Sequence, residues 1–158
     1  MRLEQRKAVV TGAAQGRGRA LAERLAAEGA DVAVLDINKA EAEATAAAIA
    51  ATSGRKVVAV PVDVTSEDAV AEAMAASAQA LGGLDLLVNN AGVLKSSFIT
   101  DFPKKDWDFV LNVNLTGAFL CVREAAKYMV EAKQGSMVVI SSRSAKRGGL
   151  WNHAYCAS

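Results

Sequence analysis

Short apolar runs alternate along this chain with longer segments in which apolar residues recur at helical spacing. The short runs predict five β-strands, at residues 7–10, 31–36, 56–61, 84–88 and 136–140. The longer segments predict helices at residues 19–28, 38–52, 65–81 and about 104–131. Strands that alternate with helices build right-handed βαβ units. The pattern therefore predicts an α/β fold with a doubly wound parallel sheet.

The ends of the predicted helices carry recognisable signals. Three glycines follow helices at a position where left-handed backbone commonly ends them: Gly29, Gly54 and Gly82. The sequence Thr65-Ser66-Glu67-Asp68 fits a capping pattern at the start of the third helix. The buried stripe behind that cap consists of Val70, Met74 and Leu81.

The last predicted helix places a polar residue on an apolar face. Leu111, Ala118, Cys121 and Ala125 recur at helical spacing, and Asn114 lies within their stripe. A buried amide costs free energy unless it is hydrogen bonded. From the residues alone, Asn114 is either a buried structural amide or part of a functional site.

Composition limits the classes of function. The chain has 158 residues, is 52% hydrophobic and carries a net charge of +1. We therefore expect one soluble, cytoplasmic domain over residues 1–158, with no nucleic-acid or membrane partner. Cys121, Cys156 and the single His153 lack the spacing of a metal site, so we expect no bound metal.

A glycine-rich turn links the first strand to the first helix. Its glycines are Gly12, Gly16 and Gly18, and the helix opens directly behind them. The first N–H groups of a helix have no internal partner, and the helix dipole adds positive charge there. A phosphate therefore fits this position, because the glycines leave room for it. The spacing is neither G-x-G-x-x-G nor that of a P-loop.

Two motifs together are typical of one family. The turn reads T-G-x-x-x-G-x-G, and Asn89-Asn90-Ala91-Gly92 leaves the fourth strand. In both motifs the chain resembles the short-chain dehydrogenase/reductase family. The resemblance implies a Rossmann-like fold and an oxidoreductase. Such an enzyme transfers a hydride between a nicotinamide cofactor and a small secondary alcohol or ketone.

The acidic residue Asp36 favours NAD over NADP. It closes the second strand about twenty residues after the glycine turn, where a carboxylate binds both adenosine ribose hydroxyls and repels a 2′-phosphate. Gln15 is not basic, although Arg17 and Arg19 are close enough in sequence to reach a phosphate.

The resemblance also assigns Asp63 to the adenine amino group, while a turn or capping aspartate fits its spacing equally well. The cofactor contacts implied by the resemblance are Gly12, Gln15, Gly16, Arg17, Gly18, Asp36, Asp63, Val64, Asn90, Ala91 and Gly92.

Three residues are candidates for catalysis by the same resemblance. Ser142 follows the fifth strand and would hydrogen-bond the substrate oxygen, and Tyr155 would carry the proton to or from it. Asn114 would kink its helix and hold a water molecule in a proton relay. Arg17 stands where the family usually has a small apolar residue, and the basic loop 143–151 lacks a family proline.

The family pattern continues beyond the last residue given. A lysine would follow Ser158, and it lowers the pKa of a tyrosine that is otherwise about 10. We therefore expect a fold truncated after the fifth strand, with its C-terminal part missing and a full-length form that is a homo-oligomer. The alternatives are a noncatalytic nucleotide-binding module and an inactive truncated product. The substrate and the direction of reaction cannot be deduced.

Overall fold

The computed structural model describes all residues, 1–158. Its five strands are β1 Lys7–Thr11, β2 Asp31–Asp36, β3 Val57–Pro61, β4 Leu86–Asn89 and β5 Ser136–Val139. Every neighbouring pair is parallel, and the strand order is β3-β2-β1-β4-β5. The predicted doubly wound parallel sheet is confirmed.

Successive side chains of the strands alternate between two apolar clusters, one on each face of the sheet. Val9 belongs to one apolar cluster, whereas Ala8 and Val10 on either side of it belong to the other. The same division separates Ala33 from Val34 in β2. Successive side chains of a strand point to opposite faces, so a strand buried on both faces is apolar throughout.

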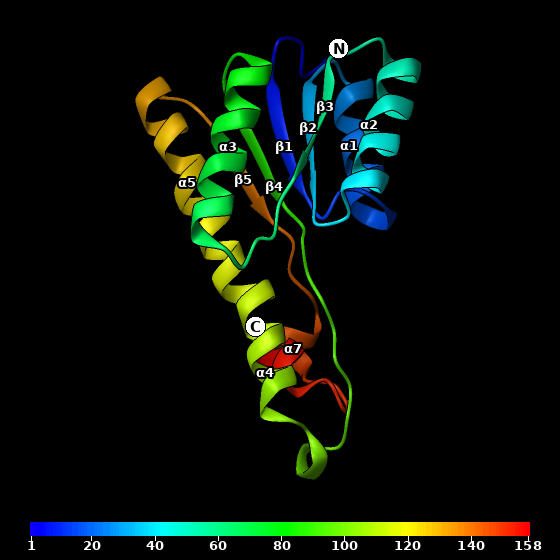
Figure 1. Cartoon of the computed structure of the whole chain (residues 1–158), viewed down its shortest axis with the longest axis vertical. Helices are drawn as coiled ribbons and strands as arrows, with labels where there is room; N and C mark the ends of the chain where they lie inside the picture. Colours follow the sequence, from blue (N-terminus) through cyan, green and yellow to red (C-terminus); the bar gives the residue numbers. More distant parts are fainter.

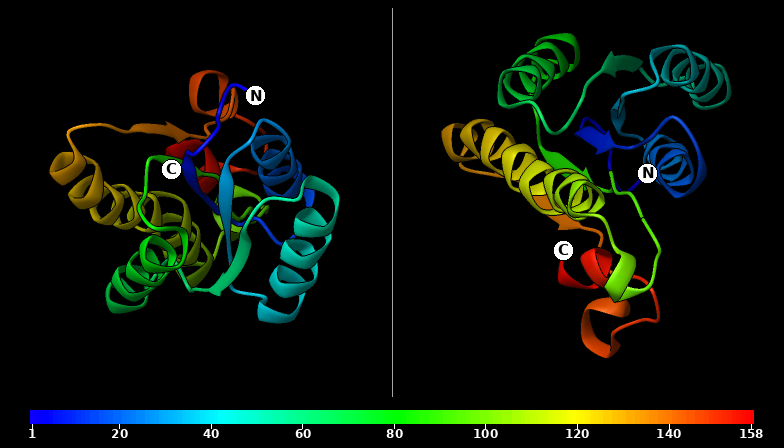
Figure 2. Two further views of the ribbon diagram at one scale, coloured as in Figure 1. Left: turned by 90° about the horizontal axis from the view of Figure 1, so that it is seen from above. Right: turned by 60° about the horizontal axis from the view of Figure 1, so that its bottom comes forward.

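Helices cover both faces of the sheet. They are α1 Gly16–Ala27, α2 Lys39–Ser53, α3 Glu67–Leu81, α4 Lys104–Leu111, α5 Gly117–Ala132, α6 Ser144–Arg147 and α7 His153–Ala157, with a 3₁₀ turn at Ile99–Asp101. The pair α1 and α2 packs on one face, and α3 and α5 pack on the other (Figures 1 and 2). No helix is both long enough and apolar enough to span a bilayer.

The cap of α3 differs from the prediction by one residue. Ser66, not Thr65, is the N-cap, and its hydroxyl accepts a hydrogen bond from the Ala69 N–H at 3.3 Å. The Thr65 hydroxyl instead donates to Asp63 at 2.8 Å. Because Asp63 holds Thr65 in the preceding turn, the helix begins one residue later.

The predicted helix 104–131 is interrupted in the middle. Residues Asn112–Thr116 form a π-helical turn between α4 and α5, in which the Gly117 N–H donates to the Asn112 carbonyl. A π turn contains one residue more than an α turn, so it shifts the buried face. Cys121 and Ala125 are buried as predicted, but Leu111 and Ala118 are only partly buried.

The segments that follow the strands extend beyond one edge of the sheet. The chain after β4 and the chain after β5 run to the region of α4 and α7, below the sheet in Figure 1. The predicted loop 143–151 contains the short helix α6. These segments all leave the carboxyl ends of the strands, where doubly wound sheets bind their ligands.

Candidate functional site

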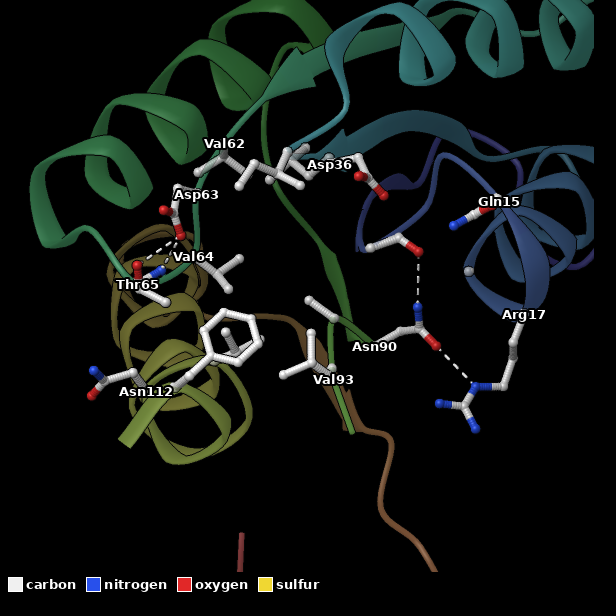
Figure 3. A pocket seen from close by; sticks show the side chains of 18 residues that line it. Gln15, Arg17, Asp36, Val62, Asp63, Val64, Thr65, Asn90, Val93 and Asn112 are labelled. Carbon is white, nitrogen blue, oxygen red and sulfur yellow. Dashed lines mark hydrogen bonds between the residues drawn. The ribbon is translucent and has the colours of Figure 1, made fainter. Parts of the chain in front are cut away.

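A cavity of about 650 Å³ lies at the carboxyl edge of the sheet (Figure 3). Ten of the eleven residues that the sequence assigned to cofactor binding line it: Gly12, Gln15, Arg17, Gly18, Asp36, Asp63, Val64, Asn90, Ala91 and Gly92. Gly16 alone is outside the lining. The structure thus brings together residues from the ends of β1, β2, β3 and β4 at one site.

The glycine turn is closely packed against its neighbours. A Cβ atom on Gly18 would lie 2.1 Å from the Gly12 carbonyl oxygen and 2.6 Å from Nδ2 of Asn90. Gly12 has a φ of +63°, and a Cβ there would lie 2.8 Å from Cα of Ala91. Gly16 has open space around it and a φ of +55°. Glycine is needed at 12 and 18 for close approach, and at 12 and 16 for left-handed backbone.

The carboxylate of Asp36 is fixed at the cavity wall. Its Oδ2 atom accepts a hydrogen bond from the Ala14 N–H, and its Oδ1 atom accepts one from the Asn38 N–H, both at 3.0 Å. The Ala14 carbonyl in turn accepts from the buried Thr45 hydroxyl at 2.6 Å. The glycine turn, the end of β2 and the start of α2 therefore hold one another in position.

Asp63 closes a turn behind β3. Its Oδ1 atom accepts hydrogen bonds from the Thr65 N–H at 2.9 Å and from the Thr65 hydroxyl at 2.8 Å. The turn role that the sequence left open is therefore present. Asp63 also lines the cavity, and its second carboxylate oxygen is not used in this turn.

The Asn89–Gly92 segment is anchored to β1 by side chains. The buried Thr11 hydroxyl donates to Asn89 Oδ1 at 3.1 Å and accepts from the N–H groups of Asn90 and Ala91 at 3.0 Å. Asn90 Nδ2 donates to the carbonyl oxygens of Thr11 and Gly12. Sequence reasoning did not assign Thr11, although a threonine between a strand and Gly12 is a signal for such a contact.

Asn114 links that segment to the region of α7. Its Oδ1 atom accepts a hydrogen bond from the Val93 N–H at 2.8 Å, and its Nδ2 atom donates to the Val93 carbonyl at 3.0 Å. Nδ2 also donates to the Ser158 hydroxyl, which donates to the Tyr155 carbonyl at 3.1 Å. The amide, which is partly buried, is thus satisfied, and it couples the chain after β4 to the helix of Tyr155.

None of the three candidate catalytic residues, Asn114, Ser142 and Tyr155, lines the cavity. Tyr155 is on α7, which packs against α4. Ser142 follows β5, and its hydroxyl accepts a hydrogen bond from the Ser144 N–H at 3.2 Å. No hydrogen bond joins Ser142 to Tyr155. Hydrogen bonds through Ser158 connect Asn114 with the backbone of Tyr155, and no hydrogen bond joins Ser142 to Asn114.

Several residues of the cavity were not predicted. They are Leu35, Ile37, Val62, Thr65, Val93, Phe109, Asn112 and Val113. Ile37 directly follows Asp36 and is 72% exposed. Its apolar side chain therefore lies at the rim of the cavity, in contact with solvent. Phe109, Asn112 and Val113 come from α4 and the π turn, and no local sequence signal brings them to the strand ends.

The remaining nucleophilic and metal-binding side chains add little to this site. Burial raises the pKa of the Cys121 thiol to about 12, so this thiol stays protonated in the core. No three His, Cys, Asp or Glu side chains gather closely enough to hold a metal ion.

Comparison with known proteins gives consistent matches. The family model described as short chain dehydrogenase matches residues 6–158. The chain is 38% identical over 143 residues to 2,3-dihydro-2,3-dihydroxybenzoate dehydrogenase of Bacillus subtilis, across 90% of this chain and 54% of that protein. It is 39% identical to D-threitol dehydrogenase of Mycolicibacterium smegmatis, across 99% and 60% of the two chains.

The fold matches solved structures of similar proteins. It superposes on NAD+-bound xylitol dehydrogenase with a TM-score of 0.96 and 32% sequence identity, covering 99% of this chain and 60% of that one. The TM-score is 0.95 for a short-chain alcohol dehydrogenase described as putative, from Sinorhizobium meliloti, which is 38% identical; the match covers 99% of this chain and 62% of that one. The chain spans 54% to 62% of the length of these four proteins.

Proposed function

Since the chain belongs to the short-chain dehydrogenase family, we propose that the protein is an NAD-dependent oxidoreductase acting on a secondary alcohol or ketone. NAD, when bound, supplies the acceptor for a hydride from the carbinol carbon. The observation that carries this proposal is the cavity at the carboxyl edge. Four strand ends bring ten residues expected to contact a dinucleotide into its wall.

The residues present fit an adenosine diphosphate group. Gly12 and Gly18 let the glycine turn pack closely against Asn90 and Ala91, which places the start of α1, with its first backbone N–H groups, at the cavity wall. Asp36 binds the ribose hydroxyls, and the free oxygen of Asp63 accepts from the adenine amino group. Both carboxylates are already oriented by backbone hydrogen bonds, so binding requires little reorganisation.

Asp36 selects NAD over NADP in this proposal. A carboxylate fixed at the end of β2 accepts hydrogen bonds from two ribose hydroxyls, whereas a 2′-phosphate would bring like charge against it. One of the solved relatives described above, xylitol dehydrogenase, is NAD+-bound. That observation supports the same choice.

The chain's own catalytic groups act on the substrate oxygen. Tyr155 donates a proton to the ketone oxygen or accepts one from the alcohol, and Ser142 hydrogen-bonds the same oxygen. Asn114 fixes the chain after β4 and, through Ser158, the backbone of Tyr155. Its contribution is to position these groups and to order a water molecule between them.

The substrate is a small alcohol in this proposal. The relatives described above are named for a dihydroxylated carboxylate, for threitol and for xylitol. The common chemical feature of those names is a pair of neighbouring hydroxyl groups on a small molecule. A panel of such diols, with and without a carboxylate, is therefore the first set of substrates to test.

The test is an assay with NAD and that panel, following NADH absorbance, on a form of the protein that includes the lysine expected after Ser158. We expect turnover with at least one diol, and Tyr155→Phe should lower kcat about a thousandfold while NAD still binds. Tyr128→Phe, on α5 near the amino end of β1, is the matched control and should keep normal turnover. Full activity of Tyr155→Phe, or a wild-type protein that binds no NAD, would refute the proposal.

A further inference from the structure

The cavity has an uneven distribution of charge. Asp36 and Asp63 place two carboxylates in its wall, and Arg17 is the single lysine or arginine among the residues that line it. A dinucleotide carries a diphosphate, which needs positive charge near it in a site with two carboxylates. Arg17 is the side chain available to supply that charge.

Arg17 also connects two parts of the cavity wall. Its Nε atom donates a hydrogen bond to Asn90 Oδ1 at 2.9 Å (Figure 3). Asn90 Nδ2 donates in turn to the Thr11 and Gly12 carbonyls. Asn90 therefore uses its amide to join the glycine turn on one side and the first turn of α1 on the other. A small apolar residue at position 17 could not make this bridge.

The contact with Asn90 uses only one edge of the guanidinium. Arg17 forms no ion pair, and its two terminal nitrogens make no hydrogen bond within the chain. Arg19, two residues further on, differs from Arg17 because its guanidinium forms an ion pair with Glu23 at 2.8 Å. An arginine held at Nε, with its remaining N–H groups free, is oriented for binding a phosphate oxygen.

Arg17 lies away from the place where the 2′-hydroxyl of the adenosine ribose would bind. Figure 3 shows its guanidinium next to Asn90, apart from Asp36 at the end of β2. Its charge is therefore placed for a group that NAD and NADP share, not for the 2′-phosphate that distinguishes them.

We infer that Arg17 binds the diphosphate of the dinucleotide while it holds Asn90, so that the two sides of the cavity are joined by one side chain. The inference rests on the proposed function, because it requires a dinucleotide in the cavity. It makes Arg17 a determinant of affinity for the diphosphate and leaves the choice between NAD and NADP to Asp36.

Calorimetry with ADP and with adenosine tests the inference on the protein and its variants. Arg17→Leu should weaken ADP binding about tenfold, the value of one exposed charged hydrogen bond, and should change adenosine binding little. Its ADP affinity should also depend less on salt than that of the wild type. Arg17→Lys keeps the charge and should recover part of the loss. Thermal unfolding of each variant confirms that it is folded.

Matched variants distinguish the possible outcomes. Arg19→Leu removes the same charge from the same helix turn and should leave ADP affinity within about twofold, since Arg19 is paired with Glu23. Asp36→Ala should change the ratio of NAD to NADP affinity, and Arg17→Leu should not. Equal losses in Arg17→Leu and Arg19→Leu, or unchanged ADP binding in a folded Arg17→Leu, would overturn the inference alone. Absence of any ADP and NAD binding by the wild type would overturn the proposed function as well.

Discussion

The helices α1 and α3 begin in opposite ways, although both follow a parallel strand. In α3 the Ser66 hydroxyl caps the Ala69 N–H, and Glu67 and Asp68 occupy the first turn. The N-terminus of a helix carries partial positive charge, so a capping oxygen and acidic side chains stabilise it. This end of α3 is satisfied by the chain itself.

The start of α1 has none of these features. Its N-cap residue, Gln15, makes no side-chain hydrogen bond, and the first turn contains no acidic residue. Arg17 and Arg19 add positive charge where the helix dipole is already positive. Helix α1 therefore lacks local stabilisation at the end that faces the cavity, which is the arrangement expected of an anion site.

The largest effect should come from adding one methyl group to the start of α1. In Gly18→Ala the new Cβ would lie 2.1 Å from the Gly12 carbonyl oxygen, and a backbone atom cannot turn away from it. We expect a loss of about 3 kcal/mol in the free energy of unfolding, together with loss of NAD binding. Urea unfolding and calorimetry measure the two effects.

Gly16→Ala is the control for that substitution. Gly16 has no atom within 4 Å of an added Cβ, so only its left-handed φ of +55° opposes alanine. The expected cost is about 1 kcal/mol, and NAD binding should persist. Equal destabilisation by the two variants would mean that the close contact of Gly18 with Gly12 does not matter.

The sequence predicted the sheet well because burial on both faces leaves a direct local signal. Val9 and Val10 point to opposite clusters, so β1 must be apolar at every position between its ends, and the same holds for β2. The π turn at Asn112–Thr116 leaves no such signal in the apolar pattern, and only the family resemblance, by which Asn114 would kink its helix, indicated a change there. The turn depends on contacts between distant segments, above all the two hydrogen bonds between Asn114 and Val93.

The residues of the candidate site also fall into a group that the sequence predicted and a group that it did not. Residues in contiguous motifs, such as Gly12 and Asn90, were predicted because the motif itself contains the geometry of a turn. Phe109 and Val113 were missed, since their place in the site depends on how α4 and the π turn approach the strand ends. The roles of Asn114, Ser142 and Tyr155 remain predictions that the assays above test.

An intermediate effect should come from giving α1 the kind of cap that α3 has. Gln15 has extended backbone angles, φ −147° and ψ 176°, which suit a capping residue. In Gln15→Asp a carboxylate would cap α1 and face Arg17 and Arg19. We expect the unliganded protein to gain up to about 1 kcal/mol in stability, and ADP to bind at least tenfold more weakly because the carboxylate competes with the phosphate.

Ser66→Ala gives the matching measurement on α3. It removes the hydrogen bond to the Ala69 N–H and should cost about 1 kcal/mol of stability without changing ADP affinity. If Gln15→Asp neither stabilises the protein nor weakens ADP binding, the start of α1 is not an open anion site. A change in ADP affinity in Ser66→Ala would show that the two helix ends are not independent.

The smallest effect should appear at the opposite end of α1, where a carboxylate follows the helix. Glu28 accepts hydrogen bonds from Arg2 at 3.1 Å and Arg24 at 2.6 Å, and these bonds lower its pKa from 4.5 to about 2. A carboxyl group whose pKa is lower in the folded protein adds stability above its unfolded pKa and loses it as the pH falls. Wild type should therefore melt slightly above Glu28→Gln at neutral pH, and the difference should shrink from pH 4.5 downward and vanish near pH 2. A difference in melting temperature that stays constant over this range would show that the ion pairs of Glu28 do not stabilise α1.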